Sequence, residues 1–217
     1  MAAEIAHTFL TSAEEHPRPR RAAADPLTPL VARARAGDTT AFDELMRATE
    51  RKVVATAWRL LGDREDTRDA AQEVYLRAFK YLARFREGED FQAWLYQITI
   101  NVCRDAATRR RRAGYATGAS DEELERAAAD FENLADPGDA ERDALLAQQR
   151  ELLRRGLNAL PERERAAIVL RDLEGLSTEE VARILNTRPV TVRSQVSSAR
   201  AKLRVYCERL QRKGGLR

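Results

Sequence analysis

The stretch EGLSTEEVARILNTRPVTVRSQVSSAR, residues 174–200, decides the fold of the C-terminal part of the chain. Ser177 followed by Glu180 predicts a capping box at the start of a short helix that ends near Asn186. Pro189 suits the first turn of a second helix, where its missing N–H does no harm. The pattern is typical either of a helix-turn-helix or of a basic amphipathic helix packed on its neighbours.

The two faces of the last helix favour the first alternative. At helical spacing, Val192, Val196, Ala199 and Leu203 share a face that is expected to pack inward. The opposite face is small and polar, and such a face fits a major groove and offers hydroxyl and guanidinium groups to bases and phosphates. It comprises Val190, Arg193, Ser194, Ser197 and Ala201, with Ser198 and Arg200 at its edges.

Helical periodicity also extends through the rest of the chain, so the predicted fold class is all-α. Helices are expected between 30 and 61 with a break at Gly37, over about 64–84, over 91–112 and over about 145–160, and a further helix is expected between Pro161 and Gly175. We expect two small helical domains joined by a flexible acidic linker. The predicted organisation is a disordered or weakly ordered tail over 1–28, a domain over 29–112, the linker over 113–139 and a second domain over 140–213.

Charge is unevenly distributed along the chain. Residues 113–148 hold ten Asp and Glu against two Arg, a net charge of −8, which leaves +11 for the remainder because the whole chain carries +3. The basic parts suit a polyanionic partner, which an acidic linker would avoid.

The sequence predicts a cytoplasmic protein without membrane insertion. Its two cysteines indicate a reducing compartment, and it shows no secretory signal and no long apolar run.

The predicted helix over 64–84 has an apolar stripe and a charged face. The stripe consists of Ala71, Val74, Tyr75, Ala78, Phe79 and Leu82. Opposite it lie Asp66, Asp69, Glu73, Arg77 and Lys80, with Gln72 beside them. From the residues themselves, a solvated charged face is the ordinary interpretation.

The predicted helix over 91–112 has two unlike faces. Phe91, Trp94, Leu95, Ile98 and Val102 form the expected core face, whereas Tyr96, Ile100 and Cys103 fall on the other side beside Gln97, Asn101 and Arg104. Either another helix covers this mixed face or a ligand with flat rings and hydrogen-bond acceptors docks on it. The helix ends in four arginines, Arg109–Arg112, which either complement the helix dipole or contact phosphates. Cys103 is either an inert thiol or an oxidation sensor.

Two blocks together resemble a known family. LPERERAAIVLRDLEGLSTEEVARILNTRPVTVRSQVSSARAKLR (160–204) is similar to region 4 of the bacterial sigma-70 family, in its extracytoplasmic-function group. GDREDTRDAAQEVYLRAFKYLARFREGEDFQAWLYQITINVCRDAATRRRR (62–112) resembles region 2 of the same proteins. The likeness covers about 30–112 and 140–210, and the two blocks stand in the family's order.

The resemblance implies a set of site residues. The positions that would grip the clamp helices of the largest RNA polymerase subunit are Asp66, Asp69, Gln72 and Glu73. The positions that would read the downstream (−10) promoter element are Phe85, Arg86, Tyr96, Gln97, Ile100, Asn101 and Arg104. The positions that would read the upstream (−35) element are Arg188, Thr191, Arg193, Ser194, Ser197, Ser198 and Arg200. Independently of the resemblance, phosphate contacts are expected from Arg109, Arg110, Arg111 and Arg112.

The function implied is that of an alternative sigma factor, which recruits core RNA polymerase to promoters and helps to open the duplex. The expected partners are core polymerase (its clamp and flap), promoter DNA and an anti-sigma factor, with no cofactor. The first alternative is a stand-alone helix-turn-helix regulator that does not bind polymerase. An enzyme is disfavoured because the only histidines, His7 and His16, lie in the tail and no phosphate loop or nucleophile motif is present.

Overall fold

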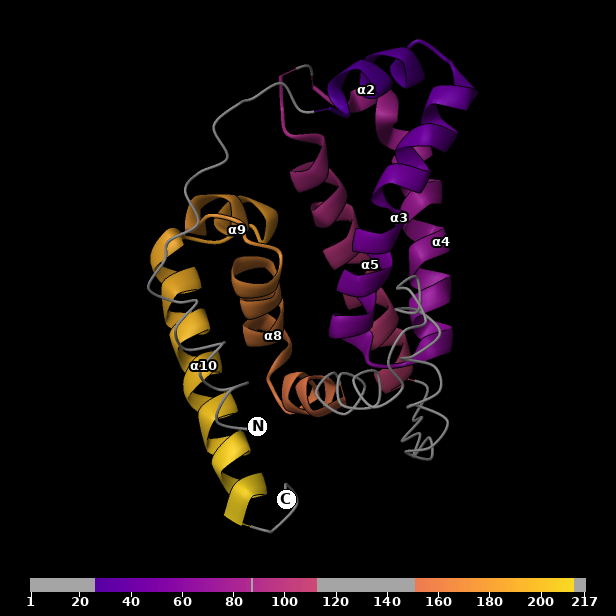
Figure 1. Cartoon of the computed structure of the whole chain (residues 1–217). Helices are drawn as coiled ribbons and strands as arrows, with labels where there is room; N and C mark the ends of the chain where they lie inside the picture. The colour runs from indigo at the N-terminus through magenta and orange to yellow at the C-terminus, as the bar shows by residue number, and fades with distance from the viewer. Residues whose placement is uncertain (1–25, 87, 113–150, 213–217) are drawn as a thin grey trace, which may run out of the picture. The chain divides into compact units, whose positions relative to one another are not determined.

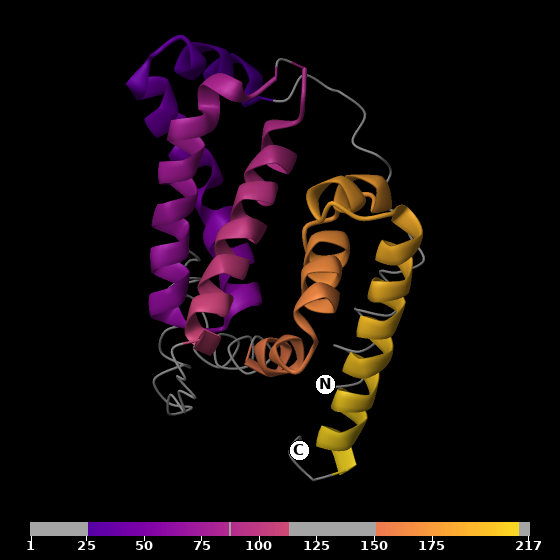
Figure 2. The same cartoon turned by 180° about the vertical axis from the view of Figure 1, so that it is seen from behind.

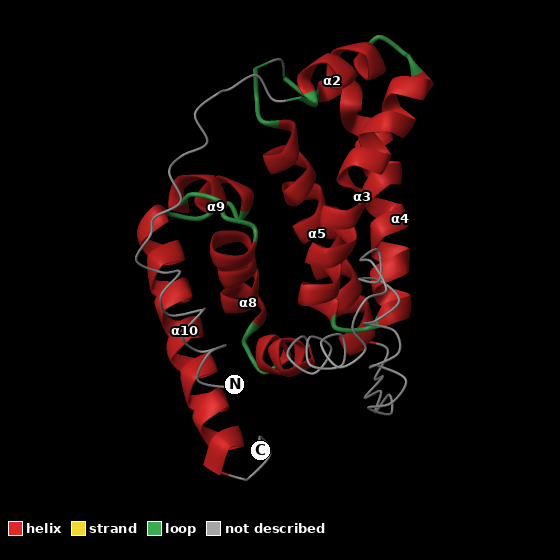
Figure 3. Cartoon of the chain, viewed as in Figure 1, coloured by secondary structure: helices red, strands yellow, loops and turns green. Residues whose placement is uncertain are grey.

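The structure is a computed structural model that describes residues 26–86, 88–112 and 151–212. These residues divide between two compact units, 26–112 and 151–212 (Figure 1). Every regular element in the described residues is helical (Figure 3), which confirms the all-α prediction. None of the described helices is both long and apolar enough to cross a membrane. Of the tail predicted over 1–28, residues 1–25 lie outside the described residues, as does the acidic linker.

The N-terminal unit contains α2 (Thr28–Arg35), α3 (Thr39–Leu61), α4 (Arg64–Tyr81), the short 3-10 turn η1 (Leu82–Arg84) and α5 (Phe91–Arg112). Figures 1 and 2 show α3, α4 and α5 running alongside one another. The predicted break at Gly37 is confirmed, and Asp38 caps α3 by accepting a hydrogen bond from the Ala41 N–H at 3.0 Å. Gly62 ends α3 in the left-handed conformation, with φ of 68°.

The core of this unit is formed between its three long helices. Leu45, Val53, Val74 and Val102 are almost completely buried. Burying such side chains contributes about 1.5–3 kcal/mol each, so this shared core holds the helix surfaces in place. The predicted stripe on α4 is wrong at Phe79, which is 57% exposed and meets the Phe42 ring edge-on at 5.0 Å.

The C-terminal unit contains a helix over 151–158, α8 (Glu162–Ile168), a π-helical turn η2 (Val169–Leu173), α9 (Thr178–Ile184) and α10 (Pro189–Arg212). The helix expected between Pro161 and Gly175 is therefore α-helical only as far as Ile168. Gly175 then stops it with φ of 71°, as predicted.

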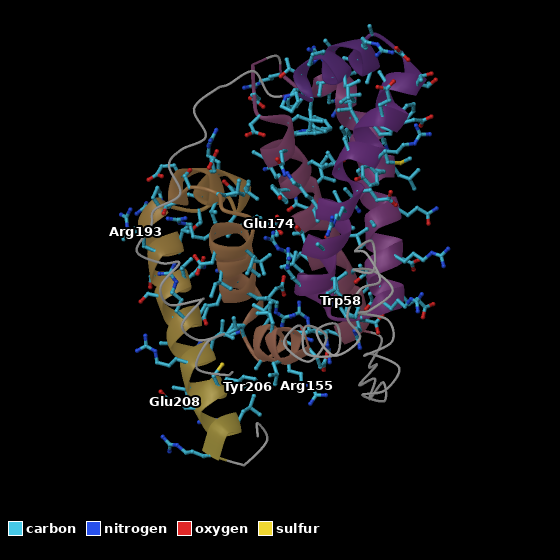
Figure 4. The ribbon with its side chains drawn as sticks, viewed as in Figure 1. Trp58, Arg155, Glu174, Arg193, Tyr206 and Glu208 are labelled. Carbon is cyan, nitrogen blue, oxygen red and sulfur yellow. The ribbon has the colours of Figure 1, made fainter. Side chains whose placement is uncertain are left out.

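The helix over 151–158 approaches α10 closely at Gly156. A Cβ atom at this position would lie 3.0 Å from Cδ2 of Leu203 and 3.5 Å from the Tyr206 ring. Figure 4 shows the side chains of Tyr206 and Arg155 close together where the two helices meet. Gly156 thus permits a tight packing that fixes the C-terminal half of α10 on its unit.

Candidate polymerase and nucleic-acid interfaces

The short helix α9 and the start of α10 form the predicted helix-turn-helix. The capping box is confirmed: the Glu180 N–H donates to Ser177 Oγ at 3.2 Å, and the Ser177 N–H donates to Glu180 Oε2 at 2.7 Å. Asn186 takes a positive φ of 49° in the turn between the helices. The predicted inward face of α10 is also confirmed, because Val192, Val196 and Ala199 are buried.

The opposite face of the first turns of α10 is exposed. Arg188, Arg193, Ser194 and Ser197 are exposed, and Thr191 is half-buried. Figure 4 shows Arg193 projecting outward from α10. Arg193, Ser194 and Ser197 lie on one side of the helix, where their donors are available to a ligand.

The last two residues of the predicted upstream set are held within the unit. Arg200 donates two hydrogen bonds to the Asp172 carboxylate at 2.7 and 2.9 Å, and this pairing raises the pKa of the guanidinium. Ser198 donates to Glu164 at 3.1 Å, and Lys202 binds the same carboxylate at 2.7 Å. Ser198 and Arg200 thus tie α10 to α8 and η2, and both are half-buried, unlike the exposed residues of the first turns.

The acidic face of α4 is partly neutralised by arginines. Glu73 accepts from Arg77 at 2.6 Å, and Asp66 accepts from Arg110 on α5 at 3.1 Å. Burial, followed by repulsion from Asp63, raises the pKa of Asp66 despite that arginine. Asp69 and Gln72 are exposed, so these two are the fully accessible members of the predicted polymerase-binding set.

Sequence reasoning missed an apolar continuation of this surface. Leu76 is 60% exposed and Phe79 57% exposed, and both follow Asp69 and Gln72 along α4. The steps 69, 72, 76 and 79 are three, four and three residues, which places all four side chains on one stripe of the helix. The same spacing was available in the sequence, but Phe79 was assigned to the core.

The predicted downstream set divides into exposed and buried residues. Arg86, Gln97, Asn101 and Arg104 are exposed. Phe85, Tyr96 and Ile100 are buried, with at most 5% of each exposed, so these three side chains belong to the core of the unit. Phe85 belongs instead to an aromatic cluster, with ring centroids 5.7 Å from Phe91 and 5.4 Å from Trp94.

The remaining residues of α5 can be assigned from their surroundings. Among the terminal arginines, Arg109, Arg111 and Arg112 are exposed, whereas Arg110 is half-buried and pairs with Asp66. Burial raises the pKa of the Cys103 thiol to about 12. The thiolate is the reactive form, so the inert alternative for Cys103 is favoured.

Comparison with known proteins agrees with the order of the two units. The family described as "Sigma-70 region 2" matches residues 45–113, and "Sigma-70, region 4" matches 150–203. The RNA polymerase sigma-H factor of Pseudomonas aeruginosa is 33% identical over 171 residues, covering 79% of this chain and 88% of that protein. The ECF RNA polymerase sigma-E factor of Escherichia coli K12 is 33% identical over 173 residues, with the same coverage.

A solved structure shares the fold. The sigma factor RpoE of Bartonella quintana, in complex with the anti-sigma factor NepR, is 22% identical with a TM-score of 0.57, over 77% of this chain and 96% of that one. The two family matches and the relatives show that the chain belongs to the sigma-70 family of RNA polymerase sigma factors, in its extracytoplasmic-function group.

Proposed function

We propose that this sigma factor binds core RNA polymerase in the cytoplasm, directs it to promoters through two DNA elements and assists melting of the duplex. It acts as a detachable specificity subunit and performs no chemistry of its own. The proposed domains are region 2 over 29–112, the acidic linker over 113–139 and region 4 over 140–213. A stand-alone regulator is not favoured, because both sigma regions are present in the family's order.

The exposed stripe of α4 carries the proposal for polymerase binding. Asp69, Gln72, Leu76 and Phe79 combine an acid, an amide and two large apolar side chains on one side of the helix. Apolar side chains rimmed by polar ones mark protein–protein interfaces, since their burial supplies affinity and the polar groups supply orientation. We assign the clamp of core polymerase to this stripe.

Promoter contacts are assigned to the exposed members of the predicted sets. In region 4 these are Arg188, Thr191, Arg193, Ser194 and Ser197 for the upstream element. In region 2 they are Arg86, Gln97, Asn101 and Arg104 for the downstream element, with Arg109, Arg111 and Arg112 on phosphates. Amides and guanidinium groups suit both base edges and the backbone.

Reconstitution with core polymerase tests this function. The wild-type chain should co-elute with core polymerase and give transcripts from a pooled promoter library. Asp69→Arg and Leu76→Asp should abolish both, whereas Glu44→Arg, the same kind of charge change at an exposed acid of α3, should abolish neither. Glu73 is unsuited to this test, because its replacement also breaks the pair with Arg77.

The opposite outcome has a clear meaning. Sequence-specific DNA binding by the chain without association with core polymerase would contradict the proposal and support the stand-alone regulator.

An anti-sigma factor is a further proposed partner. RpoE of Bartonella quintana was solved with such an inhibitor bound. We assign the inhibitor of this chain to surfaces that overlap the α4 stripe, so that it and core polymerase exclude one another.

A further inference from the structure

Val190 is an exposed aliphatic side chain in the first turn of α10. It is 60% exposed, whereas Val192 two residues later is completely buried. Steps of three, four and seven residues from Val190 lead to Arg193, Ser194 and Ser197, so Val190 lies on the same side of the helix as the assigned upstream contacts. No polar role is open to it, because its side chain has neither donor nor acceptor.

The start of α10 is the part of the helix suited to reading bases. In the later turns, Ser198, Arg200 and Lys202 are bound to carboxylates of α8 and η2. Recognition helices place their N-terminal residues against base edges in the major groove, and Val190 lies at that end of α10.

The chemistry of Val190 restricts what it can read. Of the groups in the major groove, the 5-methyl group of thymine is the apolar one. A β-branched side chain has a single preferred rotamer in a helix, so it can present its methyl groups with little loss of conformational entropy.

We propose that Val190 is a specificity-determining residue of region 4, which packs against the 5-methyl group of a thymine in the upstream promoter element. This inference rests on the proposed function, and it adds an apolar base contact to the polar set. The salt dependence of DNA binding should not depend on Val190, because the residue neutralises no phosphate.

The test removes the contact in two ways, from the DNA by taking away the 5-methyl group of thymine and from the protein by truncating the Val190 side chain. Promoter DNA selected by the wild-type holoenzyme is prepared with each thymine of the upstream element replaced, one at a time, by deoxyuridine. One replacement should weaken binding of the wild-type holoenzyme by about fourfold, the effect expected for burying one methyl group. The holoenzyme with Val190→Ala should bind the unmodified DNA more weakly by a similar factor. Its affinity should not change when that same thymine is replaced by deoxyuridine.

Val205 provides the matched control, because it is a 45% exposed valine on the same helix about 22 Å further along. Val205→Ala should keep the wild-type response to deoxyuridine. The inference is overturned if no thymine of the element responds in the wild type, or if Val190→Ala responds as strongly as the wild type. Failure to select any promoter DNA at all would instead count against the proposed function.

Discussion

Tyr75 on α4 is a half-buried titratable group whose effect on stability can be predicted. The Thr49 hydroxyl donates to the Leu45 carbonyl at 2.7 Å, and its Oγ1 lies 3.0 Å from the Tyr75 hydroxyl. Burial raises the pKa of Tyr75 to about 12, above the ordinary value of 10.0. The folded state therefore disfavours tyrosinate, so the stability from this group is complete below pH 10 and is lost as the pH rises towards 12. The loss should amount to about 2–3 kcal/mol of unfolding free energy.

Urea unfolding between pH 8 and 11.5 checks this prediction. Both tryptophans, Trp58 and Trp94, lie in the N-terminal unit, so their fluorescence reports on that unit. Tyr75→Phe should be about 1 kcal/mol less stable than the wild type at pH 8, because it loses a hydrogen bond. The variant should lose less stability than the wild type at high pH, and parallel pH curves for the two proteins would contradict the argument.

Individual residues also show which features could be predicted from the sequence and which could not. The valines on the inner face of α10 and the Ser177–Glu180 capping box could be predicted, because local spacing determines them. The burial of Phe85 could not, because it depends on η1 turning the chain so that this ring meets Phe91 and Trp94. A motif matched to a family gives a position in the sequence, whereas exposure depends on the packing around it.

At the scale of elements, the contact between α10 and its neighbours distinguishes Arg200, which is paired within the unit, from the exposed Arg193, which we assign to DNA. The Arg200 and Asp172 side chains are 27% and 11% exposed, so removing Arg200 leaves a nearly buried carboxylate unpaired. Arg200→Ala should therefore lower the unfolding free energy of region 4 by about 1–3 kcal/mol. Because Asp172 holds the guanidinium, we expect no phosphate contact from it, and the slope of log affinity against log salt should be unchanged.

Arg193→Ala is the matched comparison on the same helix. Arg193 is exposed, so its loss should leave stability unchanged and reduce the salt slope by about 0.9, the value for one phosphate contact. Circular dichroism melts and DNA titrations at several salt concentrations separate the two effects. A reduced salt slope for Arg200→Ala would return that residue to the DNA surface.

The boundaries of elements followed the sequence wherever a capping or stop residue was present. Gly62 and Gly175 end their helices as predicted, and α5 has the predicted bounds. The π-helical turn after Ile168 had no such signal, because apolar residues at helical spacing continue through it and no Gly or Pro interrupts them before Gly175. Apolar periodicity indicates that a segment is helical, but it does not resolve a change in hydrogen-bond register.

At the scale of the whole molecule, the charge of the linker should limit binding to random DNA. The linker, residues 113–139, holds eight Asp and Glu against one Arg, a net charge of −7, opposite in sign to the surfaces assigned to DNA. A tethered acidic segment repels the phosphate backbone and competes with it for the arginines of both regions. Replacing the eight acids of the linker by Asn and Gln raises the net charge of the chain from +3 to +11. The free protein should then bind promoter-less duplex DNA at least tenfold more tightly at about 0.05 M salt, and the difference should fade near 0.5 M salt, where screening is strong.

Fluorescence anisotropy with labelled duplex measures both conditions, and a linker with the same residues in scrambled order controls for composition. If the neutral and the acidic linkers give equal affinities at low salt, the linker does not shield the basic surfaces, and selectivity for promoters must come from the DNA-reading residues and from polymerase.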